Sequence, residues 1–180
     1  KRNNAMARSI DYSNMEENAS KEPKGGDPKY SKRNSSGAKK DNYLLVDGYN
    51  IIHAWPELRE LAESNFDSAR VRLMDILCNY QGYRQMILIL VFDAYKVKGG
   101  QGSVMQYNNI HVVYTKEAET ADQYIEKTVH KIGRDNNVTV ATSDGLEQII
   151  IFGQGAIRMS AMNLLEDVEV VNRQIREHIE

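Results

Sequence analysis

Tyr-Leu-Leu-Val-Asp, at residues 43–47, is the segment that decides the fold expected for this chain. It places three aliphatic side chains in succession before a carboxylate, and Gly48 follows as a turn residue. A short apolar run bounded by a turn signal is typical of a strand buried on both faces. We therefore expect residues 43–47 to form a strand that ends at Asp47.

Strand-like and helix-like segments alternate after this strand. A second buried strand, Met-Ile-Leu-Ile-Leu-Val-Phe at residues 86–92, also ends at a carboxylate, Asp93. Between the two strands, residues 66–80 place apolar side chains at helical spacing, with Asn65 or Asp67 as the cap. The remaining expected elements are strands at 110–114 and 138–142, helices at 120–132 and 145–152, and a helix at about 161–179 that begins after Ser160. This alternation predicts an α/β fold with a parallel sheet covered on both faces.

The first 42 residues differ in composition from the rest. They are rich in Lys, Asn, Ser and Gly, hold two of the three prolines, and show no apolar period. Such a segment cannot bury enough apolar surface to offset the entropy lost on ordering. We expect a disordered basic tail or linker over residues 1–42 and one globular domain over residues 43–180.

Cysteine content and hydropathy exclude several classes of protein. The single cysteine, Cys78, cannot build a disulfide framework or a Cys-x-x-Cys metal site. The longest apolar run, residues 86–92, is too short to cross a bilayer, and the N-terminal residues lack a secretory signal. These features predict a soluble, cytoplasmic protein with no membrane partner.

The expected domain is acidic, which bears on its partners. Residues 1–42 carry 10 Lys and Arg against 6 Asp and Glu, whereas residues 43–180 carry 13 against 19. Phosphate binding normally requires clustered Lys and Arg, so simple attraction to nucleic acid does not explain an acidic domain. Acidity concentrated in one metal site would remove this conflict.

Four aspartates occupy equivalent places in the expected sheet. They are Asp47 and Asp93, directly after strands, Asp122, at the start of a helix, and Asp144, one serine after the strand at 138–142. In a parallel sheet these places share one edge, beyond which ligands bind. Converging carboxylates repel one another unless a divalent cation neutralises them, and their hard oxygens suit Mg²⁺ or Mn²⁺. Such a cluster predicts phosphodiester hydrolysis, because it activates water and stabilises charge on phosphate.

Each of these aspartates also has a purely structural explanation. Asp is a common turn former or helix cap after a strand, and Asp122 and Asp144 both lie where a helix begins. Ser, Asn, Thr and Gly would cap equally well, however. Aspartate at four strand ends therefore favours a shared metal site over four separate caps.

Polar neighbours extend the candidate site. The spacing of Asn50 from Asp47 brings its amide within reach of the carboxylates, although an Asx turn would explain Asn50 as well. Thr142 and Ser143 are candidates for hydrogen bonds to a phosphate, and their structural alternatives are a strand-end Thr and a capping Ser.

Four motifs, in order along the domain, closely resemble the YacP-like NYN family. They are Leu-Val-Asp-Gly-Tyr-Asn-Ile-Ile-His (45–53), Val-Phe-Asp-Ala-Tyr (91–95), Glu-Thr-Ala-Asp (119–122) and Ala-Thr-Ser-Asp-Gly (141–145). Gly-Ala-Ile-Arg-Met-Ser-Ala (155–161) fits the same pattern. The resemblance therefore covers residues 43–180.

This resemblance implies both a fold and an activity. The implied fold is a PIN-like three-layer α/β fold with a central, mainly parallel sheet flanked by helices. The implied activity is that of a Mg²⁺- or Mn²⁺-dependent endoribonuclease acting on single-stranded RNA, with mRNA engaged with the ribosome as its partner. Matched motif by motif, Asp47, Asp93, Asp122 and Asp144 correspond to the family's acidic metal-binding positions and Asn50 to the asparagine of its first motif.

A glycine-rich loop is the first candidate for contacting RNA. Residues 95–103 follow the second acidic strand and include Tyr95, Lys96 and Lys98. The lysines would pair with phosphates and the tyrosine would contact the strand. A solvated loop without such a role is the alternative.

Arg158 and three aromatic residues complete the candidates. The planar guanidinium of Arg158, before the last helix, suits a two-point phosphate clamp or an ion pair with a carboxylate. Tyr49, His53 and Trp55 border the first motif, where they would stack on bases or pack in the core.

Three other functions are compatible with an α/β fold of this kind, and the sequence disfavours two of them. An aspartyl-nucleophile phosphatase usually needs a second Asp two residues after the first, and Tyr49 occupies that position. No Gly-x-Gly-x-x-Gly follows the first strand, so we expect no nucleotide cofactor. The non-enzymatic alternative is an RNA- or ribosome-binding module whose carboxylates do not catalyse.

Overall fold

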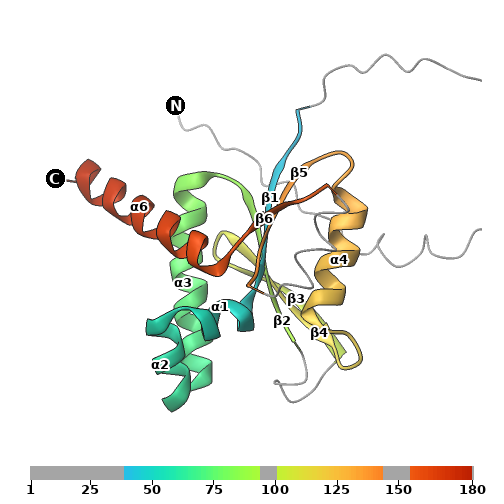
Figure 1. Cartoon of the computed structure of the whole chain (residues 1–180), viewed down its shortest axis with the longest axis horizontal. Coiled ribbons are helices and arrows are strands. Elements are labelled where there is room, and N and C mark those ends of the chain that lie inside the picture. Colours follow the sequence, from blue (N-terminus) through green and yellow to red (C-terminus); the bar gives the residue numbers. More distant parts are fainter. Residues whose placement is uncertain (1–38, 94–100, 144–154, 180) are drawn as a thin grey trace, which may run out of the picture. The chain divides into compact units, whose positions relative to one another are not determined.

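The computed structural model describes residues 39–93, 101–143 and 155–179, which are coloured in Figure 1. The strands in these ranges are β1 (Asn42–Asp47), β2 (Ile87–Phe92), β3 (Gln101–Tyr107), β4 (Ile110–Lys116), β5 (Asn137–Ala141) and β6 (Ile157–Met159). The helices are α1 (Gly48–Ala54), α2 (Pro56–Ser64), α3 (Phe66–Arg84), α4 (Ala121–Ile132) and α6 (Ala161–Ile179). The predicted α/β class is confirmed.

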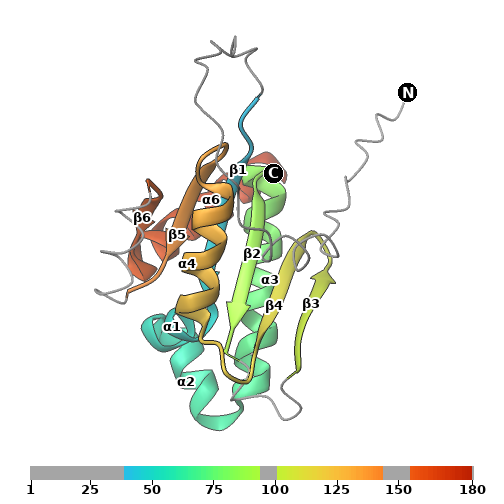
Figure 2. The same ribbon diagram turned by 90° about the vertical axis from the view of Figure 1, so that its right-hand side faces the viewer.

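The strands form one mixed sheet in the order β3-β4-β2-β1-β5-β6 (Figure 2). β1 lies between β2 and β5 and runs parallel to both. The pairs β2–β4 and β5–β6 are also parallel, whereas β3 runs antiparallel to β4. The predicted central, mainly parallel sheet is therefore confirmed, with β1 in its interior.

Side chains of β1 alternate between two cores, one on each face of the sheet. Leu44 and Val46 pack into the core shared with α1, α2, α3 and α6, whereas Leu45 packs into the core beneath α4. Figure 1 shows these two groups of helices on opposite sides of the sheet. Burying an aliphatic side chain of this size contributes about 1.5–3 kcal/mol, so the unbroken Leu-Leu-Val run stabilises both layers. The resulting three layers explain why this strand is apolar throughout.

Gly48 permits the tight passage from β1 into α1. A Cβ atom at Gly48 would lie 2.3 Å from Cε1 of the Phe92 ring, closer than non-bonded atoms approach. Phe92 is fully buried at the end of β2 and cannot give way. The first turn of α1 therefore packs directly on Phe92 because position 48 lacks a side chain.

The structure corrects several details of the sequence prediction. Gly48 begins the helix α1 and does not serve only as a turn residue. Residues 101–103, expected in a flexible loop, belong to β3, which pairs antiparallel with β4. Arg158 precedes the last helix, as expected, and the structure adds that it lies in the short strand β6. The helix expected at residues 145–152 lies outside the described residues.

The final helix, α6, begins as predicted. The Ser160 hydroxyl oxygen accepts a hydrogen bond from the Asn163 backbone N–H at 3.0 Å, which caps the first turn.

In the part of the chain that the structure describes, no helix combines the length and apolar character needed to span a membrane.

Candidate functional site

Asp47 and Asp93 lie at one edge of the sheet because β1 and β2 run parallel. Asp47 pairs with Val91 in the ladder, so Asp93 lies two residues further along the neighbouring strand. Leu45 and Val91 both pack into the core beneath α4. Side chains two residues apart on a strand share a face, so both carboxylates project on the α4 side.

Asp122 reaches the same edge from α4. Thr120 caps this helix with a capping box, in which its side chain and that of Gln123 exchange hydrogen bonds with each other's backbone N–H. Asp122 is exposed in the first turn, where a carboxylate is favoured by the helix dipole. The backbone N–H of Ala121 donates a 2.6 Å hydrogen bond to Oδ1 of Asp93. The start of α4 is thus attached directly to the end of β2.

The electrostatics of Asp47 show that the three aspartates converge. Asp47 is only 7% exposed, and its carboxylate is in hydrogen-bond contact with that of Asp122. Burial, followed by the charges of Asp122 and Asp93, raises the pKa of Asp47 to about 7, against the lowering effect of the Asn50 backbone N–H. Asp93 acts on Asp47 through its charge. Without a compensating cation, this edge of the sheet holds one carboxyl that stays protonated close to neutral pH.

Asn50 connects the two segments that border the site. Its backbone N–H donates to Oδ1 of Asp47 at 3.2 Å, which makes Asp47 the N-cap of α1. Its side-chain oxygen accepts a 2.6 Å hydrogen bond from the backbone N–H of Ser143. Asn50 therefore holds Asp47 through its backbone N–H and the segment after β5 through its side-chain oxygen. The expected contact of its amide with the carboxylates or a metal-bound water stays a prediction.

Thr142 and Ser143 differ in what they offer. Thr142 is fully buried, and its backbone N–H donates to the carbonyl oxygen of Met159 at 3.0 Å. Ser143 is exposed, and its Oγ accepts a 3.3 Å hydrogen bond from the backbone N–H of Ala161. Of the two, Ser143 keeps the access that a phosphate contact requires.

Tyr49 and Arg70 add a contact that the sequence prediction missed. Tyr49, 4% exposed, accepts a 3.2 Å hydrogen bond on its hydroxyl from Nη1 of Arg70. Arg70 also pairs with Asp67 and lies 5.9 Å from the centroid of the Phe66 ring. Burial raises the pKa of Tyr49, and Asp93 is among the charges that add to this effect. The Arg70 guanidinium thus contacts the Tyr49 hydroxyl, which lies close enough to Asp93 for the charge of Asp93 to affect its pKa.

Two of the aromatic candidates are core residues. Tyr49 packs against Phe92, with ring centroids 5.1 Å apart, and Trp55 is 2% exposed and donates to the Ala161 carbonyl oxygen at 2.7 Å. Of the two alternatives for Tyr49 and Trp55, stacking on bases or packing in the core, the structure shows packing, because both side chains are buried. His53, in contrast, is exposed.

Arg158 lies on the α4 side of the sheet but away from the aspartates. It is exposed and pairs in register with Val140, a residue of the core beneath α4. Two inter-strand spacings separate β6 from β1, which corresponds to about 10 Å. That distance suits a contact to a neighbouring phosphate better than a contact with Asp47.

Four of the predicted site residues lie outside the described ranges. They are Asp144, Tyr95, Lys96 and Lys98. Their predicted roles as metal ligand or substrate contacts stay predictions.

The aspartates fit a hard divalent cation in chemical type. Mg²⁺ and Mn²⁺ favour carboxylate oxygens, and a cation relieves the strain of one buried acid beside two others. Within the ranges that the structure describes, no group of three or more His, Cys, Asp or Glu side chains is placed so that it could hold a metal ion. The roles of Asp47, Asp93 and Asp122 as metal ligands, like that of Asp144, therefore stay predictions.

A separate hollow lies at the opposite edge of the sheet. Its volume is about 360 Å³, and its lining includes Asn42, Met86 and Asn137, which lie at the amino ends of β1, β2 and β5. None of the three converging aspartates lines it. The hollow is therefore not part of the candidate site formed by Asp47, Asp93 and Asp122.

Comparison with known proteins gives concordant matches. The family described as "YacP-like NYN domain" matches residues 44–180. The Bacillus subtilis (strain 168) protein named "Uncharacterized protein YacP" is 44% identical over 137 residues, which cover 76% of this chain and 80% of that protein. Two crystal structures of Rae1 (YacP) from Bacillus subtilis, one of them a W164L mutant, superpose with a TM-score of 0.66. The first is 44% identical in sequence over 76% of this chain and 79% of its own chain. The W164L mutant is 42% identical over 76% of this chain and 80% of its own chain.

Proposed function

This chain belongs to the YacP-like NYN domain family, and from that premise we propose that it is a metal-dependent endoribonuclease that hydrolyses phosphodiester bonds of single-stranded RNA. Membership of the family implies a nuclease-like, RNA-related function. The dependence on a metal, the cleavage within the strand and the identity of the RNA are the steps that we add.

One observation carries the proposal: the buried Asp47 carboxyl meets Asp122 and Asp93 at the ligand-binding edge of a parallel sheet. A cap for α1 would need only one carboxylate, and the capping box of α4 already uses Thr120 and Gln123. Gathering two further aspartates around a buried acid costs free energy in folding. Function, and not stability, is the reason to retain such an arrangement.

Asp47, Asp93 and Asp122, with Asp144, are the residues that would hold Mg²⁺ or Mn²⁺. When bound, the ion supplies positive charge that activates water and stabilises the charge developing on the phosphate. Attack of water on phosphorus breaks the bond from phosphorus to the ribose 3′ oxygen, and that oxygen takes up a proton. The products are a 5′-phosphate and a 3′-hydroxyl.

The chain's own groups position the reactants. The Asn50 backbone N–H orients Oδ1 of Asp47, and the Ala121 N–H orients Oδ1 of Asp93. The N-terminus of α4 contributes positive dipole charge beside the carboxylates, which favours an approaching phosphate. Ser143, Arg158, Tyr95, Lys96 and Lys98 are the proposed substrate contacts.

We further propose mRNA engaged with the ribosome, in the cytoplasm, as the physiological substrate. This part rests on the resemblance of the motifs alone. Comparing cleavage of one mRNA during translation and as free RNA would test it, and equal rates would contradict it.

The central proposal is tested by incubating labelled single-stranded RNA with the protein and Mn²⁺. We expect internal cuts with 5′-phosphate ends, and their loss with EDTA. Asp122→Asn should lower the rate at least about 100-fold, whereas Glu126→Gln, one turn later on the exposed side of α4, should leave it unchanged. Cleavage by Asp122→Asn at the full rate would show that the carboxylates are not the active site.

A non-catalytic RNA-binding module is the second candidate. It is favoured by the fact that Asp47, Asp93 and Asp122 do not themselves complete a cation site among the described residues. This alternative predicts RNA binding that survives EDTA and no metal-dependent cleavage under any condition.

A further inference from the structure

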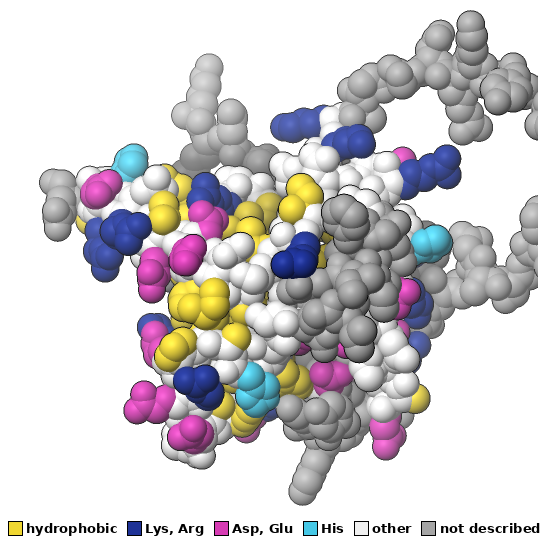
Figure 3. Space-filling model, in the orientation of Figure 1, with side chains coloured by type: hydrophobic (Ala, Val, Ile, Leu, Met, Phe, Trp, Pro, Cys, Tyr) yellow, Lys and Arg dark blue, Asp and Glu magenta, His cyan; other side chains and the backbone are white. Residues whose placement is uncertain are grey.

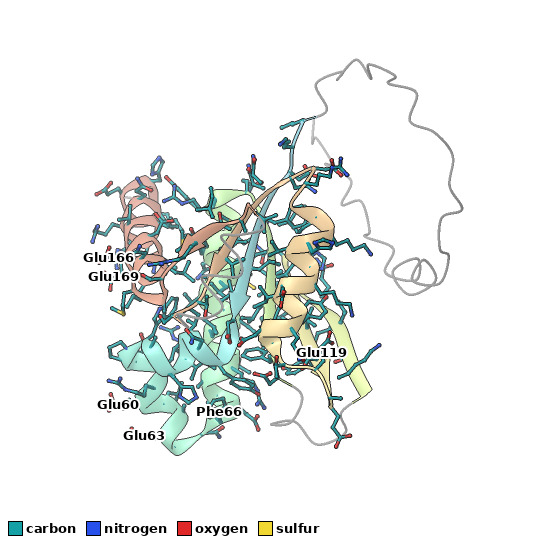
Figure 4. The ribbon with its side chains drawn as sticks, turned by 45° about the vertical axis from the view of Figure 1, so that its right-hand side comes forward. Glu60, Glu63, Phe66, Glu119, Glu166 and Glu169 are labelled. Carbon is teal, nitrogen blue, oxygen red and sulfur yellow. The ribbon has the colours of Figure 1, made fainter. Side chains whose placement is uncertain are left out.

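An exposed aromatic surface borders the aspartates on the side of α1. The imidazole of His53 lies 5.9 Å from the ring of Phe66, between centroids, with the two planes inclined by 58°. His53 is exposed near the end of α1, and Phe66 is half-buried at the start of α3. Figure 4 labels Phe66 at this end of α3, beside α1. We refer to these two side chains as the aromatic ledge.

The ledge is joined to the carboxylates by a short helix. Asp47 caps α1 at its start, and His53 lies six residues later in the same element. At 1.5 Å per residue, the two lie about 9 Å apart along the helix axis. Stacked nucleotides rise about 3.4 Å each, so fewer than about three nucleotides separate the two positions on a bound strand.

The rest of the surroundings hold the ledge in place. The Phe66 ring packs against the buried Tyr49, with centroids 5.2 Å apart, and the Arg70 guanidinium lies 5.9 Å from its centroid. Tyr49 in turn accepts a hydrogen bond from Arg70. Packing accounts for the inner part of Phe66, but an exposed imidazole contributes little to the core. The His53 ring therefore lies at the protein surface beside the Phe66 ring.

Charge alone gives this domain little attraction for RNA. Residues 43–180 carry more Asp and Glu than Lys and Arg. On the face shown in Figure 3, basic and acidic side chains are interspersed over α2 and α6. A strand bound to such a surface needs contacts that do not depend on net charge. Stacking of a base on an aromatic ring is such a contact and is worth about 1–3 kcal/mol per base.

We propose that the aromatic ledge of His53 and Phe66 is a nucleobase-stacking subsite for single-stranded RNA, with Arg70 supplying positive charge behind the ring. This inference rests on the proposed function, because it assigns a place to one base of the same substrate. The base would lie one to three nucleotides from the phosphate that is cut, and stacking would accept any of the four bases.

The test combines variants of His53 with RNAs that lack a single base. A set of single-stranded 10-mers, each with one abasic nucleotide, is cleaved in Mn²⁺, and KM and kcat are measured. For the wild type, one abasic position close to the cut should raise KM about 5- to 160-fold, the range expected from losing one stacked base. His53→Ala should raise the KM of the intact RNA by a similar factor. In His53→Ala, the same abasic position should cause no further loss, since both changes remove one contact.

Three variants make the result specific. His53→Phe should retain tight binding, because it keeps a stacking face. Phe66→Leu should weaken binding while preserving most of the apolar volume. His130→Ala, which removes another exposed helical histidine, on α4, should change nothing. Equal thermal midpoints for His53→Ala and wild type would exclude unfolding as the cause.

Binding is also followed in EDTA with a set of 10-mers that carry 2-aminopurine at each position in turn, because the fluorescence of 2-aminopurine falls when it stacks. Quenching by the wild type and its loss in His53→Ala would support the subsite even if no cleavage occurs. A wild type that cleaves RNA while His53→Ala has unchanged KM and quenching would overturn the ledge and leave the nuclease proposal intact. A wild type that neither binds nor cleaves RNA would overturn both.

Discussion

The side-chain oxygen of Asn50 accepts a 2.6 Å hydrogen bond from the backbone N–H of Ser143, which lies 93 residues later in the chain. This bond joins the first turn of α1 to the segment that leaves β5. Because the backbone N–H of Asn50 also binds Asp47, one residue holds two strand ends of the site in a common register. Asn50 therefore both caps the start of α1 through Asp47 and fixes the position of the segment after β5.

Replacing Asn50 should lower the rate of RNA cleavage strongly and the free energy of unfolding only modestly. In Asn50→Ala the Ser143 N–H loses its acceptor, which should lower the free energy of unfolding by about 1–2 kcal/mol. RNA cleavage should fall at least about 10-fold in kcat, because the segment after β5 loses its anchor beside the carboxylates. Urea unfolding and steady-state kinetics measure the two effects. Asn79→Ala, on the exposed side of α3, is the control, and equal kcat in both variants would refute this role.

Two glycines should respond in opposite ways to substitution by alanine. Gly48→Ala forces a methyl group against the buried Phe92 ring and should lower the free energy of unfolding by about 1–3 kcal/mol or more. Gly82 lies within α3, where an added Cβ would meet only the Asn109 side chain, at 3.6 Å. Gly82→Ala should therefore raise stability by about 0.5–1 kcal/mol through helix propensity. Urea unfolding of both variants checks the pair, and a stable Gly48→Ala protein would contradict the packing described.

The elements that carry their signal locally could be predicted from the sequence. The apolar run before Asp47 predicts a buried strand because the required pattern lies within five residues, and residues 86–92 repeat it before Asp93. The capping residue of α6, Ser160, was predictable for the same reason. Short-range patterns therefore predict that Asp47 and Asp93 lie at the ends of strands.

Elements that depend on a distant partner could not be predicted in this way. β3 shows no clean apolar alternation because it is an edge strand, and it exposes both Val104 and Met105 at 44%. Pairing with β4 selects its conformation, and no local pattern announces that pairing. The link between Arg70 and Tyr49 is tertiary too, and its only sequence signal is the i, i+4 spacing of Phe66 and Arg70 on α3.

The burial of candidate side chains was likewise beyond the sequence. Tyr49, His53 and Trp55 lie within seven consecutive residues at and after the first motif, yet of the three only His53 is exposed. The direction in which α1 packs on Phe92 decides this difference. The raised pKa of Asp47 arises in the same manner, from burial and from carboxylates that come from other segments.

Stability in the absence of metal should fall as the pH rises through neutrality. Burial raises the pKa of Asp47 to about 7 from an ordinary value of 3.8, so the folded protein binds this proton more tightly than the unfolded chain does. The resulting stabilisation is complete below about pH 4 and is lost as the pH rises through 7. Urea unfolding in EDTA from pH 5 to pH 8 should show a loss of a few kcal/mol at most.

Asp47→Asn isolates this effect from other titrating groups. Burial lowers the pKa of His111, which acts in the opposite direction, but His111 is present in both proteins. The stability of Asp47→Asn relative to wild type should therefore increase between pH 5 and pH 8. A constant difference over this range would mean that Asp47 titrates normally.

Divalent cations should reverse that loss, and this distinguishes a shared metal site from a set of independent helix caps. A ligand that binds only the folded state stabilises it by about 2.7 kcal/mol when its free concentration is 100 times its Kd. Mg²⁺ or Mn²⁺ at pH 8 should therefore raise the thermal midpoint of the wild type, and the increase should shrink towards pH 5, where a proton competes for Asp47. Asp47→Asn and Asp122→Asn should show little of the increase, whereas Glu126→Gln should show all of it. If the caps were independent, no variant would differ from wild type in its response to metal, because one carboxylate alone binds these ions too weakly to shift the midpoint.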